Sequence, residues 1–230
     1  MSGSSGQLLG ILGGTFDPIH YGHLRCALEL KQDLPLRELR LVPCGIPPHR
    51  ETPHASVEQR LRMLQAAVAD SPEFIIDTRE LSRSGPSYSV DTLRALRTEQ
   101  GATPLCLIVG QDAFNALDSW HCWQELMDLA HIVVAHRPGW TRPQHGAVAD
   151  LLSRHGVTEV AALQRQAAGC ILPWSVTALD ISATAIRALI AAGKSPRYLL
   201  PDAVWRIIAQ ERLYAAGTPL LMGNPRLFQP

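Results

Sequence analysis

Two histidines stand three residues apart in the segment GGTFDPIHYGH, which runs from Gly13 to His23. The apolar run LLGILGG before it, residues 8–14, predicts a buried strand that ends in a tight turn. The segment after it has apolar residues at near-helical spacing. A helix that begins near Tyr21 would place His20 at its N-terminus and His23 in its first turn, on one side of the helix. Both imidazoles could then contact one ligand.

A strand, turn and helix in this order favour an anion as that ligand. The turn presents backbone N–H groups and the positive end of the helix dipole, and the glycines Gly13 and Gly14 allow an anion to approach the main chain. A lone histidine is more often structural than functional, and a Gly-Gly turn after a strand is common. The combination of the two features predicts a phosphate site.

A second segment, ISATAIR at 181–187, has residue types that also suit an oxyanion. Ser182 is placed to cap a helix, and Thr184 and Arg187 would share one face of it. Hydroxyls, free backbone N–H groups and a guanidinium together bind phosphate well. A plain capped helix with a surface arginine is the alternative, and the residues alone leave both open.

Predicted strands and helices alternate along the chain, which is typical of a parallel sheet with helices on both faces. We therefore predict an α/β, Rossmann-like, doubly wound fold whose ligands bind beyond the carboxyl ends of the strands. Ser56 and Gln59 form a capping-box pattern, and Gly101 closes a helix. The predicted strands are 8–14, 37–43, 74–79, 104–110, 131–137 and 170–176, and the predicted helices are 21–34, 56–70, 88–101, 123–130, 148–155, 182–193 and 202–214.

Composition narrows the class of protein. The 21 basic residues balance 21 acidic ones, so the charge gives no support for nucleic-acid binding. Five cysteines without a C-x-x-C pair predict neither disulfides nor a zinc site, and fit a reduced, cytoplasmic protein. No signal peptide or membrane-spanning run is recognised. We expect one domain over 8–214, with a flexible tail or expression linker at 1–7 and an irregular extension at 215–230.

The quoted segments resemble a known superfamily. GGTFDPIHYGH and ISATAIR resemble the two phosphate-binding elements of the nucleotidylyltransferases, and the resemblance extends over about 8–214. Three further segments, VPCGIPPHRE, GPSYSVDTL and VGQDAFNALDSWHCWQEL, resemble loops of the bacterial nicotinate-nucleotide adenylyltransferases and occur in the same order. The resemblance resolves the open choice at ISATAIR in favour of phosphate binding.

The resemblance also implies residue roles. Cys44 departs from the usual asparagine, and Ser89 replaces a common threonine but keeps its hydroxyl. Taken alone, Trp120 could be a core residue, Asp112 a helix cap and the Pro-Pro-His-Arg loop a solvated turn. The implied catalytic residues are His20, His23 and Arg187, the implied ATP-binding residues are Gly14, Thr15, Phe16, Gly110, Asp112, Ser182, Thr184 and Arg187, and the implied nicotinate mononucleotide-binding residues are Cys44, His49, Arg50, Ser89 and Trp120.

The implied reaction joins ATP and nicotinate mononucleotide to give deamido-NAD and pyrophosphate, a step of NAD biosynthesis. Mg²⁺ would accompany ATP, held by phosphates and water rather than by a dedicated protein site. The alternatives are adenylylation of nicotinamide mononucleotide, dual specificity, another acceptor such as pantetheine phosphate, and a nucleotide sensor without turnover. His20 argues against the pantetheine branch, which usually has threonine there. A homo-oligomer is compatible with the sequence.

Overall fold

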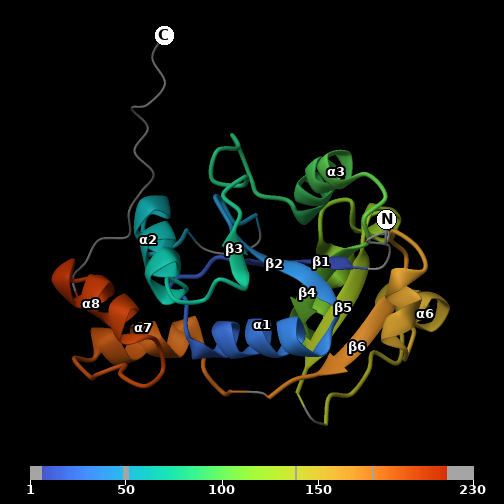
Figure 1. Ribbon diagram of the computed structural model, residues 1–230. Helices are drawn as coiled ribbons and strands as arrows, with labels where there is room; N and C mark the ends of the chain where they lie inside the picture. The colour runs from blue at the N-terminus through green and yellow to red at the C-terminus, as the bar shows by residue number, and fades with distance from the viewer. Residues whose placement is uncertain (1–6, 49–51, 138, 178, 217–230) are drawn as a thin grey trace.

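The computed structural model describes residues 7–48, 52–137, 139–177 and 179–216. Its six strands form one parallel sheet in the order β3-β2-β1-β4-β5-β6 (Figure 1). The strands are β1 (Leu8–Gly14), β2 (Leu36–Pro43), β3 (Phe74–Ile76), β4 (Leu105–Gly110), β5 (His131–His136) and β6 (Ile171–Ser175). The predicted doubly wound α/β fold is confirmed.

Eight α-helices and three 3₁₀ helices surround the sheet in the described part of the chain. None of these helices is long and apolar enough to cross a membrane. The α-helices are α1 (Tyr21–Asp33), α2 (Val57–Ala67), α3 (Ser89–Gln100), α4 (Gln111–Asn115), α5 (Leu126–Leu129), α6 (Ala147–His155), α7 (Ala183–Ala191) and α8 (Asp202–Gln210), and the 3₁₀ helices are η1 (Leu117–Ser119), η2 (Trp123–Glu125) and η3 (Val160–Gln164).

The strand order reverses between β1 and β4, which makes this the switch point of the sheet. The chain runs outward from β1 to β3 on one side and from β4 to β6 on the other. Leu12 pairs with Ile108 of β4, and Gly14 pairs with Pro43 of β2. The loops that follow β1, β2 and β4 therefore start at the same edge of the sheet.

Side chains alternate between two hydrophobic cores, one on each face of the sheet. Cys106 faces the core shared with α1, α2, α7 and α8, whereas its neighbour Leu107 faces the core shared with α3, α4, α5 and α6. Figure 1 shows α1 and α3 on opposite sides of the strands. Burial on both faces explains why the central strands are almost continuously apolar.

One predicted strand is shorter in the structure because a side chain takes over a backbone hydrogen bond. The strand predicted at 74–79 ends at Ile76. Beyond it, the Asp77 N–H still donates to the Leu41 carbonyl over 3.0 Å, but the Asp77 carboxylate accepts the N–H of Arg79 over 3.1 Å. The carboxylate thus turns the chain away from the sheet.

The predicted helix 123–130 is split into η2 and α5, preceded by Cys122 in a left-handed conformation with φ of 50°. The predicted helix 202–214 ends at Gln210, and Arg212 and Tyr214 have φ values of 52° and 62°. Positive φ is incompatible with a continuing α-helix. The apolar pattern did not indicate α4, η1 or η3, which are too short for a clear period.

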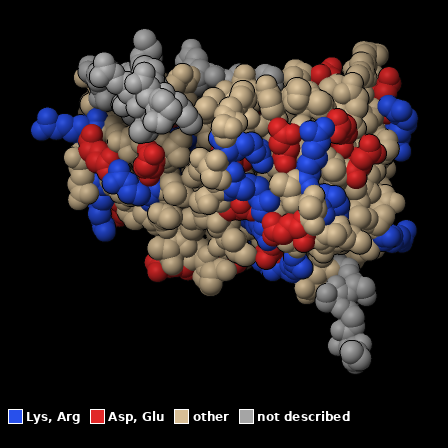
Figure 2. All heavy atoms as spheres, turned by 90° about the horizontal axis from the view of Figure 1, so that it is seen from above, with Lys and Arg blue, Asp and Glu red and all other residues tan. Residues whose placement is uncertain are grey.

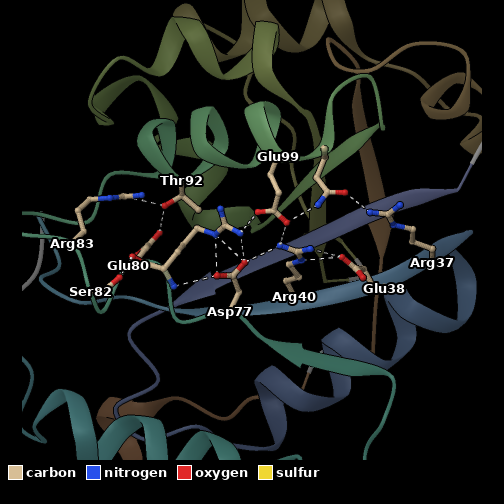
Figure 3. Close-up of polar contacts among 11 residues, drawn as sticks. Arg37, Glu38, Arg40, Asp77, Glu80, Ser82, Arg83, Thr92 and Glu99 are labelled. Atoms are coloured by element: carbon tan, nitrogen blue, oxygen red, sulfur yellow. Dashed lines mark hydrogen bonds and ion pairs between the residues drawn. The ribbon is translucent and has the colours of Figure 1, made fainter.

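A polar network fixes α3 against β2 and the loop after β3 (Figure 3). Arg40 Nη1 of β2 lies 3.1 Å from Asp77 Oδ2 and 3.2 Å from Glu99 Oε1 of α3. Arg79 Nη2 contacts the same two acids at 2.7 and 2.8 Å. Such a partly buried network gains more than isolated surface pairs. It holds the C-terminal end of α3 beside β2 and the loop after β3.

The face of the molecule that is seen in Figure 2 carries charged side chains of both signs. Figure 2 shows basic and acidic side chains interspersed there, without a continuous basic area. The exposed Arg94 of α3 is likewise paired with acids, because its guanidinium lies 2.9 Å from Asp91 and 2.6 Å from Glu125. Charges of opposite sign thus compensate each other locally on this face.

Arg97 binds the C-terminal end of α3 to the amino edge of the sheet. Its Nη1 donates to the carbonyls of Gly101 and Thr103, each over 2.7 Å, and its Nη2 donates to those of Leu129 and Ala167 over 2.5 and 2.8 Å. These residues precede β4, β5 and β6. The contacts therefore lie at the sheet edge opposite the loops that follow β1 and β2.

We predict that Arg97→Met lowers the free energy of unfolding by about 1 to 3 kcal/mol, because four carbonyls lose a charged donor. Urea denaturation should show a lower midpoint with an unchanged slope. The control is Arg62→Met, which removes an exposed ion pair with Glu211 and should change stability by less than about 1 kcal/mol. Equal midpoints for the two variants would contradict the structural role of Arg97.

Candidate active site

The turn after β1 has the compact shape that its glycines predict. Phe16 is buried with φ of 50°, and its ring meets the His23 ring edge-on, with centroids 5.2 Å apart. A Cβ added at Gly14 would lie 2.8 Å from a carbon of the Phe16 ring. A larger residue at position 14 would therefore displace the Phe16 ring, which packs on His23.

His20 and His23 lie together at the start of α1, as their spacing predicts. Their rings stack with centroids 3.8 Å apart and an interplanar angle of 28°. His20 is the N-cap of α1, and its Nδ1 accepts the N–H of Gly22 over 3.1 Å. With Nδ1 as acceptor, the neutral ring carries its hydrogen on Nε2 and can donate there.

Burial lowers the pKa of His20 to about 4. Only 5% of the residue is exposed, and desolvation disfavours the charged imidazolium. His20 is thus a neutral hydrogen-bond donor at physiological pH rather than a cation. Any positive charge that this site offers to a phosphate must come from elsewhere.

The segment before α7 packs directly against the start of α1. A Cβ added at Gly22 would lie 2.9 Å from the His20 ring and 3.2 Å from the carbonyl oxygen of Ile181. Only glycine therefore allows this approach without a shift. The contact brings the ISATAIR segment beside the two histidines.

Arg187 joins the two predicted phosphate elements. Its Nη1 donates to the main-chain oxygen of Asp17 over 2.7 Å, and its Nη2 lies 3.4 Å from the Thr184 hydroxyl. Ser182 is the N-cap of α7 and accepts the N–H of Ala185 over 3.2 Å. The structure thus brings Ser182, Thr184 and Arg187 next to the turn after β1. Their guanidinium and helix N-terminus supply the positive charge that neutral His20 lacks.

The loop after β2 is held beside the same turn. The Cys44 N–H donates to the Gly14 carbonyl over 2.9 Å. The next residue, Gly45, donates its N–H to the Ser87 hydroxyl over 3.0 Å, and a Cβ there would lie 2.6 Å from the Glu80 carbonyl oxygen. Cys44 therefore contributes its backbone to this arrangement, whatever its side chain does.

An aromatic contact joins the segment before α3 to the segment after η1. The rings of Tyr88 and His121 lie 4.2 Å apart between centroids. Ser89, the first residue of α3, and Trp120 are their chain neighbours, and both are half-buried. The Trp120 side chain packs against the core on the α3 face, so part of it serves as a core residue. The segments 87–89 and 120–121 thus lie side by side.

Gly110 ends β4 and caps the N-terminus of α4, with Asp112 exposed in the first turn. Among the described residues other than its chain neighbours, none has an atom within 4 Å of the position that a Gly110 Cβ would occupy, so the backbone here faces open space. The pairing of Leu12 with Ile108 sets Gly110 at the level of Gly14. The predicted residues His49 and Arg50 lie outside the described residues.

Asp17 is a buried residue whose role the sequence did not reveal. Only 5% exposed, its carboxylate accepts the N–H groups of His54 and Ala55 over 2.8 and 3.2 Å and the hydroxyl of Tyr214 over 2.7 Å. It thereby ties the turn after β1 to the segment before α2 and to the segment after α8. Its position inside GGTFDPIHYGH was the only signal available.

Arg60 of α2 was also missed. It is 1% exposed, and its guanidinium donates to the carbonyl oxygens of Thr15, Cys44 and Gly45 over 2.7, 2.7 and 3.1 Å. A weak signal existed, because position 60 shares a helix face with the apolar Met63 and Leu64. A charged residue on a buried face indicates a specific partner.

Two grooves in the described part of the molecule do not coincide with the residues that the sequence predicts for the site. A groove of about 420 Å³ lies between α1 and the end of β6, and another of about 360 Å³ lies beside α6. Neither is lined by the histidines, by Arg187 or by the turn after β1. We therefore assign the site from the residues that converge at the switch point, where parallel sheets bind ligands.

We predict that His20 makes stability depend on pH. Because its folded pKa of about 4 lies below its ordinary value of 6.5, the unfolded chain takes up a proton first as the pH falls from about 6.5 to about 4. The free energy of unfolding should therefore fall over this range, by about 3 kcal/mol from this residue. His20→Asn keeps a good N-cap and should reduce that fall, as measured by urea denaturation from pH 7.5 to pH 4.

The same substitution at the exposed His145 is the matched control. If His20→Asn and His145→Asn changed the pH dependence equally, the burial of a neutral His20 would be wrong.

Known proteins resemble this chain over most of its length. The profile of the cytidylyltransferase-like family matches residues 11–189. Proteins named "Probable nicotinate-nucleotide adenylyltransferase" are 51% identical in Aeromonas salmonicida, over 90% of this chain and 97% of that protein, and 54% identical in Cellvibrio japonicus, over 90% and 98%. A third, from Methylococcus capsulatus, is 52% identical over 90% and 100%.

Among solved structures, the Plasmodium falciparum nicotinic acid mononucleotide adenylyltransferase complexed with NaAD superposes with a TM-score of 0.68 at 17% identity. The alignment covers 90% of this chain and 97% of that one. The same enzyme complexed with APC gives a TM-score of 0.65. This structural similarity shows a shared fold, whereas the sequence identities given above show membership of the family. The chain belongs to the nicotinate-nucleotide adenylyltransferases within the cytidylyltransferase-like family.

Proposed function

We propose that this protein transfers AMP from ATP to nicotinate mononucleotide, giving deamido-NAD and pyrophosphate. One observation carries the proposal. Arg187 donates a hydrogen bond to the main-chain oxygen of Asp17, which belongs to the turn that leads to the stacked His20 and His23 at the switch point of the sheet. Two phosphate-binding elements from opposite ends of the chain thus face one another, in a chain about half identical to named adenylyltransferases.

The chemistry requires positioning more than proton transfer. The acceptor is a phosphate, which is already mostly dianionic at neutral pH, so no protein base has to activate it. Its oxygen attacks the α-phosphorus in line, and pyrophosphate leaves from the opposite side. The neutral His20, together with His23, donates hydrogen bonds to the charge that develops, and Arg187 supplies positive charge.

The ATP side of the site is built from strand ends and helix starts. The turn at Gly14, Thr15 and Phe16 offers backbone N–H groups to the triphosphate. Ser182 and Thr184, at the start of α7, hold the phosphates from the other side with Arg187. The open backbone at Gly110 and the exposed Asp112 contact the nucleoside.

The acceptor side recognises the nicotinate acid. Ser89 begins α3, where unpaired N–H groups and the helix dipole favour a carboxylate. A carboxylate accepts hydrogen bonds only, whereas a carboxamide also needs an acceptor for its N–H₂ group. Trp120 stacks on the pyridine ring, and the loop containing Cys44, His49 and Arg50 holds the mononucleotide phosphate.

Mg²⁺ fits this arrangement as a partner of ATP. It binds mainly through substrate phosphates and water, and needs few protein ligands. In the described residues, hydroxyl oxygens of Thr15 and Thr184 lie on the two phosphate-binding elements, and no cluster of three or more acidic, histidine or cysteine residues is arranged for a metal. The cation would neutralise phosphate charge, while the residues above orient both substrates.

The decisive experiment supplies ATP with each mononucleotide in turn and follows the dinucleotide formed. We predict a preference for nicotinate over nicotinamide mononucleotide above about tenfold in kcat/KM, because an amide N–H₂ would face other donors. Trp120→Ala should weaken use of both acceptors equally, since stacking does not distinguish the substituents, and should leave the KM for ATP nearly unchanged. Equal kcat/KM values would assign dual specificity instead, and absence of any dinucleotide would leave a nucleotide-binding sensor.

We further predict that His23→Ala lowers kcat by about 10²-fold, since one donor preorganised at a developing charge is worth about 2.7 to 4 kcal/mol. Steady-state kinetics with saturating ATP and nicotinate mononucleotide measures the effect. His145→Ala, at an exposed position outside the site, is the control. A folded His23→Ala enzyme with the wild-type kcat would exclude His23 from catalysis.

A further inference from the structure

Arg60 links the turn after β1 to the loop after β2, just beyond the point where the pairing of these two strands ends. The last ladder bond between the chains of β1 and β2 runs from the Cys44 N–H to the Gly14 carbonyl. Beyond it, one nitrogen of Arg60 donates to both the Thr15 and the Cys44 carbonyl, each over 2.7 Å. Its second nitrogen donates to the Gly45 carbonyl over 3.1 Å. The guanidinium thus bridges the turn after β1 and the loop after β2.

Stability alone does not explain a buried guanidinium here. Position 60 lies on the face of α2 that carries the fully buried Met63 and Leu64, where an apolar side chain would pack without desolvating a charge. Burial lowers the pKa of Arg60, although arginine remains charged in proteins. The chain therefore bears a desolvation cost at this position.

The planar guanidinium suits the observed task. Its donors have a fixed geometry, so three carbonyl oxygens bound to one fork are held at fixed distances from each other. Lysine could reach some of the same oxygens, but only as a flexible point charge. Arg60 thus sets a spacing that neither strand can set once the ladder has ended.

We propose that Arg60 is a positioning residue, which holds the triphosphate turn and the acceptor loop at the separation needed for in-line attack. This inference rests on the proposed function, in which Thr15 belongs to the ATP side and Cys44 to the acceptor side. A displacement near 1 Å between reacting groups can reduce the rate about 10²-fold. Loss of the bridge should therefore lower kcat more than it raises either KM.

The test compares Arg60 with Arg97, which also donates to several main-chain carbonyls but lies at the opposite sheet edge. Arg60→Met, Arg60→Lys, Arg97→Met and Arg97→Lys are assayed at saturating ATP and nicotinate mononucleotide, and their urea midpoints are recorded. We expect kcat to fall at least about tenfold in Arg60→Met and less in Arg60→Lys. Both Arg97 variants should keep kcat within about twofold while their midpoints fall.

Equal kcat losses at the two positions would overturn the proposal, as would a folded Arg60→Met enzyme with wild-type kcat. If neither Arg60 variant folded under the assay conditions, Arg60 would be a residue of general stability, which also overturns it. The activity of the wild-type protein distinguishes a failure of the proposed function from a failure of the positioning role. Failure of the wild-type protein to form a dinucleotide would contradict the proposed function, whereas wild-type turnover with an unchanged Arg60→Met enzyme would contradict only the positioning role.

Discussion

The candidate site depends on one hydrogen bond, which the Arg187 guanidinium donates to the main-chain oxygen of Asp17. The residue that supplies this oxygen is itself fixed, since its carboxylate accepts two backbone N–H groups and the Tyr214 hydroxyl. Burial and the nearby Asp17 carboxylate raise the pKa of Tyr214, so its hydroxyl keeps the hydrogen that it donates. One residue thus orients the first loop of the sheet, the segment before α2 and the start of α7.

The distribution of charge follows from where water is excluded. His20 is buried and neutral, and it acts through hydrogen-bond direction. Arg187 is only half-buried, so its guanidinium is partly exposed to solvent. Arg60 is more fully buried than either, and it is bound to carbonyl oxygens rather than to carboxylates. The candidate site therefore combines hydrogen-bond donors with positive charge, both of which suit a polyanion. The guanidinium of Arg60 is not available to such a ligand, because it already donates to main-chain carbonyls.

Local sequence was sufficient where local physics decides the structure. The start of α1 and the pairing of its histidines follow from helical spacing, and the capping box of Ser56 and Gln59 forms as predicted. The buried strands were recognisable because they are apolar on both faces. Contacts between distant segments could not be predicted, since no residue near Tyr214 indicates that its hydroxyl reaches Asp17. The burial of Arg60 likewise depends on three carbonyls that only the folded loops bring together.

The contact between Tyr214 and Asp17 spans 197 positions of the chain. During synthesis, the turn after β1 is made early, and its Asp17 carboxylate can accept the His54 and Ala55 N–H groups before it accepts the Tyr214 hydroxyl from the segment after α8. Closing so long a loop is entropically demanding and slows folding. The Tyr214 contact is therefore expected to form after the local contacts of the turn, so this part of the candidate site is completed late in folding.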